Sequence, residues 1–494
     1  MTTQNANVSN FDFTDLITNS IFNSKFESKY GAMNLIQSDK RRLIVGLGAT
    51  GKSCMRHFLR LGLPFSVLDT RSQPPGIQDI AREFPDVEIC LGEQHSDLIN
   101  SASELYISPG IALDDLIFNG LDSDSTFISG DIDLFAGEVA APVIAISGSN
   151  AKSTVTTLVG EMARQAGLNA GIGGNLGEPA LNLLSPQRDC YVLELSSFQL
   201  ERCSELRPQV ACLLNISADH MDRHHTMMAY HQAKQRVYRG AEHIVFNRHD
   251  ALTKPLLSAG VTVSSFGLDA PDLLQYGIRE IDGQKTICKG FDTLLPVSEL
   301  PLSGDHNLLN VLAALAIGAA ADFDMTAMLE AIKSFKGLEH RCELVAQING
   351  VTYINDSKAT NVGATVAAIR GFASSLKGQL ILIAGGETKG ADFSALLKEL
   401  NVVDCKAILI GEGAAEIRAL IEANRSVKSI EVLQASSLEQ AVEIASENAQ
   451  PGDLVLLSPA CASLDMFKGF EHRGDVFKAA VTQLKHTSAQ GDQQ

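Results

Sequence analysis

The chain has 494 residues, a length that corresponds to about three domains. Its 40 basic and 58 acidic residues give a net charge of −18 at pH 7. This balance argues against a general nucleic-acid binder and against a protein that binds anionic membranes, so an anionic substrate would need local basic sites.

The N-terminal segment and the cysteines limit the classes of protein to which the chain can belong. Residues 1–40 are rich in Asn, Ser and Thr, lack a basic segment followed by an apolar one, and predict a mobile extension. The nine cysteines form no C-x-x-C pair, and we interpret them as reduced core residues of a cytoplasmic protein. The longest apolar run, Val311–Ala321, is too short to cross a bilayer, so we expect no membrane insertion.

Residues 41–130 predict a first domain of alternating strands and helices. The apolar strand Arg42–Val45 leads into the turn Gly46–Gly51, a helix follows, and the next strand ends at Asp69. A G-x-G-x-x-G turn with an acid about 20 residues later is typical of dinucleotide binding. Because Lys52 and a serine follow, the turn also fits G-x-x-x-x-G-K-S. Three ligands remain open here: NAD(P), a nucleoside triphosphate, and the diphosphate of another nucleotide.

Residues 131–335 predict a second domain, which opens with the linker-like segment Gly130–Pro142. The stretch Val143–Thr157 then gives a buried strand, a turn of small residues, and Lys152 at the start of a helix. This is the layout of a phosphate-binding loop, in which backbone N–H groups hold phosphates, the lysine neutralises charge and a hydroxyl reaches Mg²⁺. Ala151 stands where such loops usually have glycine, and its side chain restricts a positive φ.

Polar residues end the next two buried strands of this domain. Glu194 lies in the run Tyr191–Leu195, and a carboxylate beside a phosphate loop suits Mg²⁺. His220 follows the run Val210–Ile216. Ligands of an open parallel sheet bind at such strand ends. The segment Gly171–Gly177 is too glycine-rich to predict regular structure.

The histidines near the second strand end do not predict a zinc site, because no second cluster completes a set of ligands. His220 is the better candidate for a functional role, and we interpret three others as solvated: His224, His225 and His231. Lys234 lies within a helix expected over about 226–238, and its position alone indicates a surface lysine. A hairpin is predicted over Tyr276–Cys288, and a helix opens at Gly304–Asn310.

Residues 336–494 alternate strand and helix again. Asp356 and Lys358 lie in the turn after the first of these strands and are candidates for a site. The expected strands are Val351–Ile354, Leu380–Ile383, Ala407–Ile410 and Leu454–Leu457.

Over about residues 41–485, the chain resembles the Mur ligase family, ATP-dependent amide-forming enzymes of peptidoglycan synthesis. The family-wide motifs are G-[ST]-N-x-K-S-T, L-E-L-S-S-F-Q-L-E, N-I-S-A-D-H-M-D, G-x-H-N-x-x-N and E-H-R. The D-glutamate-adding type is indicated by N-D-S-K-A-T-N, G-G-x-x-K-G-A-D-F and S-P-A-C-A-S-L-D-x-F. The D-N-P-R signature of diaminopimelate-adding relatives is absent.

The resemblance implies three α/β domains. A Rossmann-like N-terminal domain over 41–130 would bind the UDP-linked substrate. A central mononucleotide-binding domain of the P-loop type over 131–335 would bind ATP. A Rossmann-like C-terminal domain over 336–494 would bind D-glutamate and close over ATP. The first glycine-rich loop, although it is the better literal match, would then not be the ATP loop.

The resemblance also implies a reaction. The γ-phosphate of ATP would pass to the carboxylate of UDP-N-acetylmuramoyl-L-alanine, and the amine of D-glutamate would attack the acyl phosphate. A tetrahedral intermediate would collapse to an amide, ADP and phosphate. Phosphorylation supplies the leaving group that a carboxylate lacks, and the approach of two anions demands Mg²⁺ and lysine.

By resemblance, Lys152 stabilises the moving phosphoryl group, Ser153 and Glu194 hold the first Mg²⁺, and His220 and Lys234 serve the second. Family lysines at this last position are N-carbamylated, which turns a cation into a carboxylate ligand. The expected cofactors are ATP, two Mg²⁺ ions and a carbamylated Lys234. The other implied contacts are Gly148, Ser149, Asn150, Ala151, Lys152, Ser153, Thr154, Asn310, Arg341 and Asp356 for ATP; Thr50, Asp69, Thr70, Arg71, Gly110 and Asn175 for the UDP substrate; and Thr360, Lys389, Ser463 and Phe470 for D-glutamate.

We expect a monomer that acts on these small molecules and binds no nucleic acid. Two alternatives belong to other enzyme types. A folylpolyglutamate-type ligase would share the ATP core but lack the S-P-A-C-A-S segment, and an NAD-dependent oxidoreductase would use Gly46–Asp69. A GTPase-type switch would need an N-K-x-D motif, which the sequence lacks.

Overall fold

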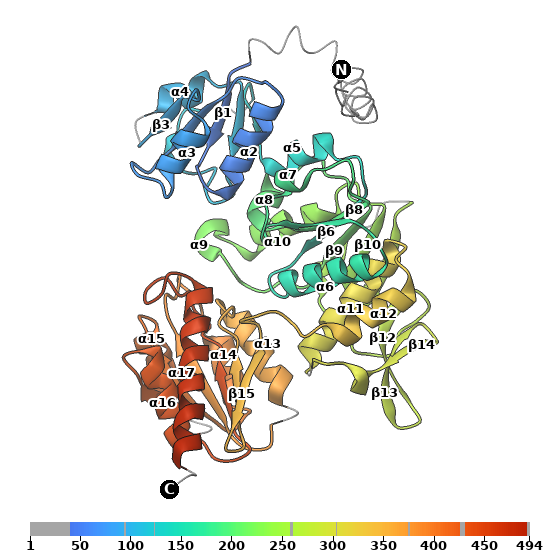
Figure 1. Cartoon of the computed structure of the whole chain (residues 1–494), viewed down its shortest axis with the longest axis vertical. Helices are drawn as coiled ribbons and strands as arrows, with labels where there is room; N and C mark the ends of the chain where they lie inside the picture. The colour runs from blue at the N-terminus through green and yellow to red at the C-terminus, as the bar shows by residue number, and fades with distance from the viewer. Residues whose placement is uncertain are drawn as a thin grey trace, which may run out of the picture. The chain divides into compact units, whose positions relative to one another are not determined.

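The computed structural model describes residues 40–491 except 93–94, 123, 257–259, 303, 374–375 and 425–429, with only the backbone for 486–491. The extension predicted over residues 1–40 therefore lies outside the described residues, apart from its last residue. The chain divides into two compact units, one that ends at Ser129 and one that begins at Gly130. Together they contain three sheets (Figure 1). Within the described ranges, no helix is both long enough and apolar enough to span a bilayer.

The first unit holds a parallel sheet with the strand order β3-β2-β1-β4-β5. Strand β1 has β2 on one side and β4 on the other, so the loops after β1 and β4 diverge and leave a crevice at the carboxyl ends. The predicted strand, turn and helix at its start are confirmed. The elements are β1 (Arg42–Val45), α2 (Ala49–Arg60), β2 (Ser66–Asp69), α3 (Ile77–Glu83), β3 (Ile89–Leu91), α4 (Ser96–Ser101), β4 (Glu104–Ile107) and β5 (Phe127–Ser129).

The second unit begins with a nine-stranded sheet in the order β14-β13-β12-β11-β10-β9-β6-β8-β7. Strands β6 to β12 pair in parallel, and β12, β13 and β14 form an antiparallel meander whose first turn, Asp282–Gly283, confirms the predicted hairpin. The strands are β6 (Val143–Ser147), β7 (Ala170–Gly174), β8 (Cys190–Glu194), β9 (Val210–Leu213), β10 (His243–Asn247), β11 (Thr262–Phe266), β12 (Gln275–Ile281), β13 (Gln284–Lys289) and β14 (Asp292–Pro296).

Two helices of this unit, α6 and α11, lie against each other over the sheet (Figure 1). In α6 the apolar residues Val155, Leu158, Val159 and Met162 recur at helical spacing, and all are fully buried in the main core. This packing fixes the N-terminus of α6 at the end of β6. The helices are α5 (Asp131–Glu138), α6 (Lys152–Gln165), α7 (Ala180–Leu183), α8 (Ser197–Glu201), α9 (Met221–His224), α10 (Met227–Gln235), α11 (Asp305–Ala320) and α12 (Met325–Ser334).

The prediction of a linker over Gly130–Pro142 is wrong, because helix α5 occupies most of that segment. Ile132 and Phe135 lie three residues apart and are buried, and the ring of Phe135 meets the ring of Tyr191 edge-on at 5.1 Å. The helix has only eight residues, which is shorter than the window over which a helical period can be recognised, so the sequence pattern did not reveal it.

The prediction of irregular structure at Gly171–Gly177 is also wrong, because strand β7 covers its first half. Glycine is needed there for close packing. A Cβ on Gly171 would lie 2.7 Å from the Tyr191 ring, and one on Gly173 would lie 2.3 Å from the carbonyl oxygen of Glu178. The glycines therefore mark a closely approached edge strand rather than a loop.

The third sheet has the order β15-β16-β20-β17-β18-β19, with β15 antiparallel and the other strands parallel. Helices α13, α14 and α15 bury one face, and α16 and α17 bury the other. The four expected strands are confirmed, and β15 and β19 are additional. The elements are β15 (Glu343–Ile348), β16 (Val351–Asn355), α13 (Val362–Ala373), β17 (Leu380–Gly385), α14 (Ser394–Leu400), β18 (Cys405–Ile410), α15 (Ala414–Ala423), β19 (Glu431–Gln434), α16 (Leu438–Asn448), β20 (Leu454–Leu457) and α17 (Phe470–Gly491).

Candidate active site

The phosphate loop joins β6 to α6. Helix α6 begins at Lys152 without a side-chain cap and without an acid in its first turn, so its N-terminal N–H groups and positive dipole end remain available to an anion. Ala151, just before the helix, has φ 66°, which is the left-handed conformation that a glycine would adopt without strain.

Two lysines meet on one carbonyl of this loop. The Lys152 amine donates to the carbonyl oxygens of Gly148 and Ser149 at 2.9 Å each, and the Lys234 amine donates to that of Gly148 at 2.7 Å. Lys234 is 2% exposed, so the surface location inferred from its position is wrong. Helix α10 carries it inward, and the Tyr230 ring lies 4.8 Å from its amine. Burial, together with the charge of Lys152, lowers the pKa of Lys234 well below its usual range.

Glu194 ends β8 beside the loop and is 2% exposed. Its Oε1 accepts a hydrogen bond from Asn175 at 2.6 Å, whereas its Oε2 is buried and has no hydrogen-bond partner in the described part of the chain. Because a buried carboxylate oxygen without a partner is costly, this atom calls for a cation. The carboxylate acts electrostatically on both Lys152 and Lys234.

Ser153, the predicted hydroxyl ligand, is engaged by an arginine. The Arg341 guanidinium, which precedes β15, donates to Ser153 Oγ at 2.6 Å. Burial lowers the pKa of Arg341, and the nearby carboxylates of Glu194 and Asp356 partly offset this effect. The arginine therefore stands where the phosphates of a nucleotide would enter.

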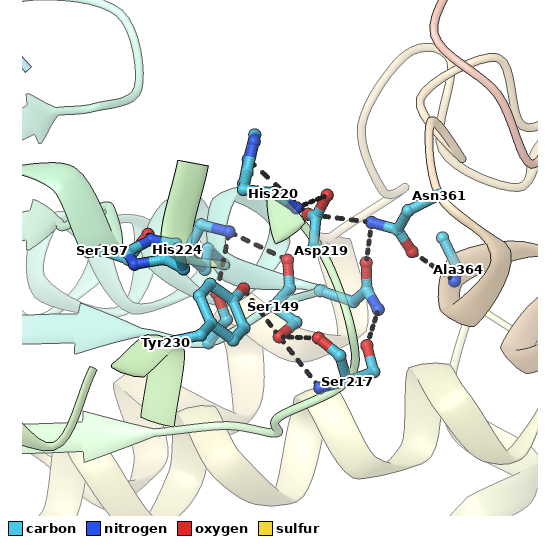
Figure 2. A network of polar contacts seen from close by, with 12 residues as sticks. Ser149, Ser197, Ser217, Asp219, His220, His224, Tyr230, Asn361 and Ala364 are labelled. Atoms are coloured by element: carbon cyan, nitrogen blue, oxygen red, sulfur yellow. Dashed lines mark hydrogen bonds and ion pairs between the residues drawn. The ribbon is translucent and has the colours of Figure 1, made fainter. Parts of the chain in front are cut away.

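The structure corrects the prediction for one histidine, His224. Figure 2 shows His220 and His224 with their neighbours. His220 precedes α9 and is partly exposed, with Nε2 3.7 Å from Asp219 Oδ2. His224 is buried, so its interpretation as solvated is wrong. Its Nε2 lies 2.9 Å from Ser197 Oγ and its Nδ1 lies 3.2 Å from a carboxylate oxygen of α8. These partners come from a different strand end, and no local pattern marks them. His225 is exposed and His231 is half-buried.

Asn361, which sequence reasoning did not assign, connects the third sheet to the phosphate loop (Figure 2). Its Nδ2 donates to Asp219 Oδ2 at 3.1 Å and to Asn150 Oδ1 at 3.3 Å, while its Oδ1 accepts from the Ala364 N–H at 2.9 Å. Tyr230 is a second residue that was missed, because its hydroxyl lies 2.9 Å from Ser149 Oγ of the loop.

A cavity of about 1010 Å³ opens beside the loop, and its volume suits a nucleotide. Its wall includes Asp356, whose pKa is raised to about 6 by burial. Six of the residues predicted to contact ATP line it: Asn150, Ala151, Thr154, Asn310, Arg341 and Asp356. The other four do not line it: Gly148, Ser149, Lys152 and Ser153.

The residues predicted for the UDP substrate divide between the two units. Five lie at the carboxyl edge of the first sheet: Thr50, Asp69, Thr70, Arg71 and Gly110. Asp69 Oδ2 accepts from the Leu47 N–H at 2.7 Å and Arg71 also pairs with it. Burial alone would raise the pKa of Asp69, but these contacts outweigh it and lower the pKa. Asn175 lies in the second unit, where it is joined to Glu194.

The residues predicted for D-glutamate follow neighbouring strands of the third sheet. Thr360 follows β16, Lys389 follows β17, Ser463 follows β20 and Phe470 begins α17. An isolated bridge between Glu387 and Ala462 joins the loops after β17 and β20. Lys358 belongs with this group, because its amine lies 3.6 Å from the centroid of the Phe470 ring. Burial lowers the pKa of Lys358 to about 8.

The residues expected to bind magnesium do not form a cluster of carboxylates and imidazoles. Within the described ranges, no three or more His, Cys, Asp or Glu side chains gather as a metal site. Glu194 nevertheless offers an unpaired buried oxygen at the end of β8, which pairs with the strand that leads into the phosphate loop. A hard cation that takes oxygen ligands and retains water fits this donor set.

Three family models match the chain: "Mur ligase MurD-like, N-terminal domain" over residues 40–125, "Mur ligase middle domain" over 146–318, and "Mur ligase, glutamate ligase domain" over 340–461. A UDP-N-acetylmuramoylalanine–D-glutamate ligase of Pseudomonas aeruginosa is 51% identical over 453 residues, which cover 92% of this chain and 100% of the relative.

Solved structures are similar in fold at low sequence identity. A UDP-N-acetylmuramate–alanine ligase of Thermotoga maritima has a TM-score of 0.56 at 15% identity and covers 90% of this chain and 100% of its own. FolC of E. coli in complex with ADP, without folate substrate, has a TM-score of 0.53 at 17% identity and covers 72% and 93% of the two chains.

Proposed function

We propose how this site works from one premise: the chain belongs to the Mur ligase family. It is an ATP-dependent ligase that adds D-glutamate in peptidoglycan synthesis, as its relatives at about half identity do. The observation that carries the details proposed below is the phosphate loop, where Lys152 and Lys234 share the buried Gly148 carbonyl and the nearby Glu194 keeps one unpaired carboxylate oxygen.

The phosphate loop prepares phosphoryl transfer to the substrate carboxylate. When bound, Mg²⁺ held by Glu194 and Ser153 would neutralise phosphate charge. Lys152 turns from its own loop carbonyls to the phosphates, because a charged amine binds a phosphate oxygen more strongly than a neutral carbonyl. Arg341 leaves Ser153 Oγ for the nucleotide in the same way. The N-terminus of α6 adds N–H donors fixed in advance.

We further propose that Lys234 is N-carbamylated. Its buried amine has one carbonyl as its hydrogen-bond acceptor, and within the described ranges no carboxylate lies within 4.0 Å of it. The positive charge of the neighbouring Lys152 disfavours the charged form of the Lys234 amine. A neutral amine adds CO₂ to form a C–N bond and releases one proton. The carbamate would supply an anionic oxygen ligand that, with His220, would hold a second Mg²⁺.

The remaining substrates are assigned to the two other sheets. The loop after β1, with Asp69 and Arg71, would hold the UDP group, and Asn175 would contact the muramoyl part. The loops after β16, β17 and β20 would seat D-glutamate, with Lys389 pairing one carboxylate. The amine attacks the acyl phosphate, the C–O bond to phosphate breaks, and the lost amine proton leaves to water. We also propose that the enzyme acts as a monomer in the cytoplasm, where ATP and nucleotide sugars are found.

Phosphate release from ATP tests the function. The purified chain, Mg²⁺ and UDP-N-acetylmuramoyl-L-alanine should release phosphate only when D-glutamate is added, among a panel that includes L-glutamate and diaminopimelate. Release that depends on either of these instead would overturn the assignment. A folate acceptor with L-glutamate tests the folylpolyglutamate alternative, and nicotinamide absorbance tests the oxidoreductase alternative.

The carbamate has its own test. Carbon-13 NMR of protein exchanged into labelled bicarbonate should show one carbamate signal, absent in Lys234→Ala and retained in the exposed control Lys254→Ala. Lys234→Ala should lose turnover, and bicarbonate should not restore it. A wild-type spectrum without the signal, or full activity in Lys234→Ala, would remove the carbamate from the proposal.

A further inference from the structure

Arg473 in α17 is a completely buried cation that none of the roles above uses. It is 0% exposed and is among the largest fully buried side chains in the described part of the chain. Within that part, no carboxylate lies within ion-pair distance of it. Its donors reach neutral acceptors instead: Ser357 Oγ at 3.0 Å, the Ser357 carbonyl at 2.8 Å, and the carbonyls of Cys461 and Ala462 at 3.2 and 3.1 Å.

These acceptors belong to the segments proposed to seat D-glutamate. Ser357 lies in the loop that carries Thr360, and its hydroxyl donates to the Phe470 carbonyl at 2.8 Å. Cys461 and Ala462 directly precede Ser463. One guanidinium therefore ties together the loop after β16, the loop after β20 and the start of α17.

The fourth segment joins through a shared carbonyl. The oxygen of Ala462 accepts from Arg473 and also from the Glu387 N–H at 3.1 Å, and the Ala462 N–H returns a bond to Glu387 at 3.0 Å. Lys389 lies two residues further along. A displacement of Arg473 would therefore be transmitted to every loop of the proposed seat.

The charge of Arg473 is as informative as its geometry. A buried guanidinium is costly to desolvate, and the carboxylates of Asp465 and Asp356 act on its charge only from beyond ion-pair distance. Burial lowers the pKa of Arg473 to about 10, which leaves it charged at neutral pH. A site that must attract an amine bearing two carboxylates gains from a further fixed cation behind the loops that carry Lys358 and Lys389.

We propose that Arg473 is the positioning residue of the D-glutamate seat: it holds the four loop segments in register, and its fixed positive charge, which no carboxylate within ion-pair distance neutralises, favours a dicarboxylate amine. This inference rests on the proposed seat and deepens it. Arg473 needs no direct contact with the substrate, because it acts through the loops and through its field.

Steady-state kinetics of two substitutions test this role. Arg473→Gln, which removes the charge, should raise the KM for D-glutamate by at least about tenfold, with the KM values for ATP and the UDP substrate within about twofold of wild type. Arg473→Lys retains the charge but cannot reach all the acceptors, so its D-glutamate KM should lie between. The control Lys478→Gln removes a cation from the same helix that pairs with Glu339, Glu343 and Asp475, and it should leave all three values unchanged.

A purely structural arginine predicts a different pattern: the thermal midpoint and the active fraction would fall while all three KM values stayed at wild type, and this result would overturn the inference. If Arg473→Gln does not fold, Arg473→Lys and Ser357→Ala decide, since both should raise the D-glutamate KM selectively. A wild-type enzyme without D-glutamate-dependent phosphate release would instead overturn the proposed function itself.

Discussion

At the scale of single residues, Ala151 adopts a strained backbone conformation in the phosphate loop. A non-glycine residue in the left-handed region is disfavoured by about 1–2 kcal/mol, and here the buried strand before it and the packed helix after it leave no alternative. The sequence predicted that the Ala151 side chain restricts a positive φ. In the structure Ala151 nevertheless adopts a positive φ.

Ala151→Gly should relieve this strain. It should also raise the conformational entropy of the unfolded chain, which lowers the free energy of unfolding by about 0.5–1 kcal/mol. We expect an unchanged product, a thermal midpoint equal to or slightly above wild type, and a lower KM for ATP because a methyl group leaves the phosphate path. The control Ala419→Gly changes an exposed alanine within α15 and should lower the midpoint. A lower midpoint in Ala151→Gly would contradict the strain.

Other residues show where sequence reasoning stops. The phosphate loop could be predicted from local order, because a strand, a turn and a lysine follow one another in the chain. The burial of Lys234 and His224 could not, since each depends on partners from distant strand ends. The resemblance directed attention to Lys234 and included Asn361 in a motif without giving it a role, whereas nothing local distinguished Tyr230 or Arg473 from ordinary polar residues.

At the scale of elements, long apolar periods were predicted correctly and short or glycine-rich elements were not. Strands such as β6 and β20 are continuous apolar runs, which can be recognised from the sequence alone. Helix α5 is too short to show a clear period, and β7 contains the residue type most often found in loops. Its glycines are explained only by the neighbours that approach them.

Gly173→Ala tests that explanation. The added Cβ would lie 2.3 Å from the Glu178 carbonyl oxygen and 2.9 Å from a Leu183 methyl, so the substitution should cost about 1–3 kcal/mol in the free energy of unfolding. The control Gly469→Ala would meet only the flexible Glu471 carboxylate, at 3.1 Å. Denaturant unfolding compares them, and equal midpoints would contradict the close approach.

At the scale of the whole molecule, Asn361 connects two sheets of the second unit through one side chain. It caps α13 and also holds Asn150 and Asp219. A capping residue alone contributes about 1 kcal/mol to stability. Its contacts with the phosphate loop therefore indicate a role in aligning the ATP loop with the loops of the third sheet.

Asn361→Ala should lower kcat by roughly tenfold, because misalignment of reactants costs rate steeply. Ser437→Ala provides a matched control: it also removes a helix cap, from α16, but Ser437 caps only the Gln440 N–H. Both variants should lose similar stability, and only the first should lose rate. Equal kcat values for the two variants would show that Asn361 acts only as a helix cap and would contradict a role in alignment.

The pH dependence of unfolding reflects buried acids. Burial raises the pKa of Asp131 to about 6, so the folded state binds more protons than the unfolded state between about pH 4 and 6. The contribution of Asp131 to stability therefore falls as pH rises through this window. Asp131→Asn, which cannot ionise, should gain thermal midpoint relative to wild type from pH 4 to 7. A constant difference would contradict the raised pKa.

The contact between Arg341 and Ser153 has a consequence for affinity. Together with Lys152 bonded to its own loop carbonyls, it describes a self-satisfied resting loop in which each future phosphate partner already has an acceptor. If Lys152 and Arg341 bind the nucleotide as proposed, ATP would exchange with these internal acceptors, and its apparent dissociation constant would equal the intrinsic value divided by the fraction of molecules whose loop is released. On these proposed roles, the affinity for nucleotide depends not only on the contacts made in the complex but also on how firmly the empty loop holds Lys152 and Arg341.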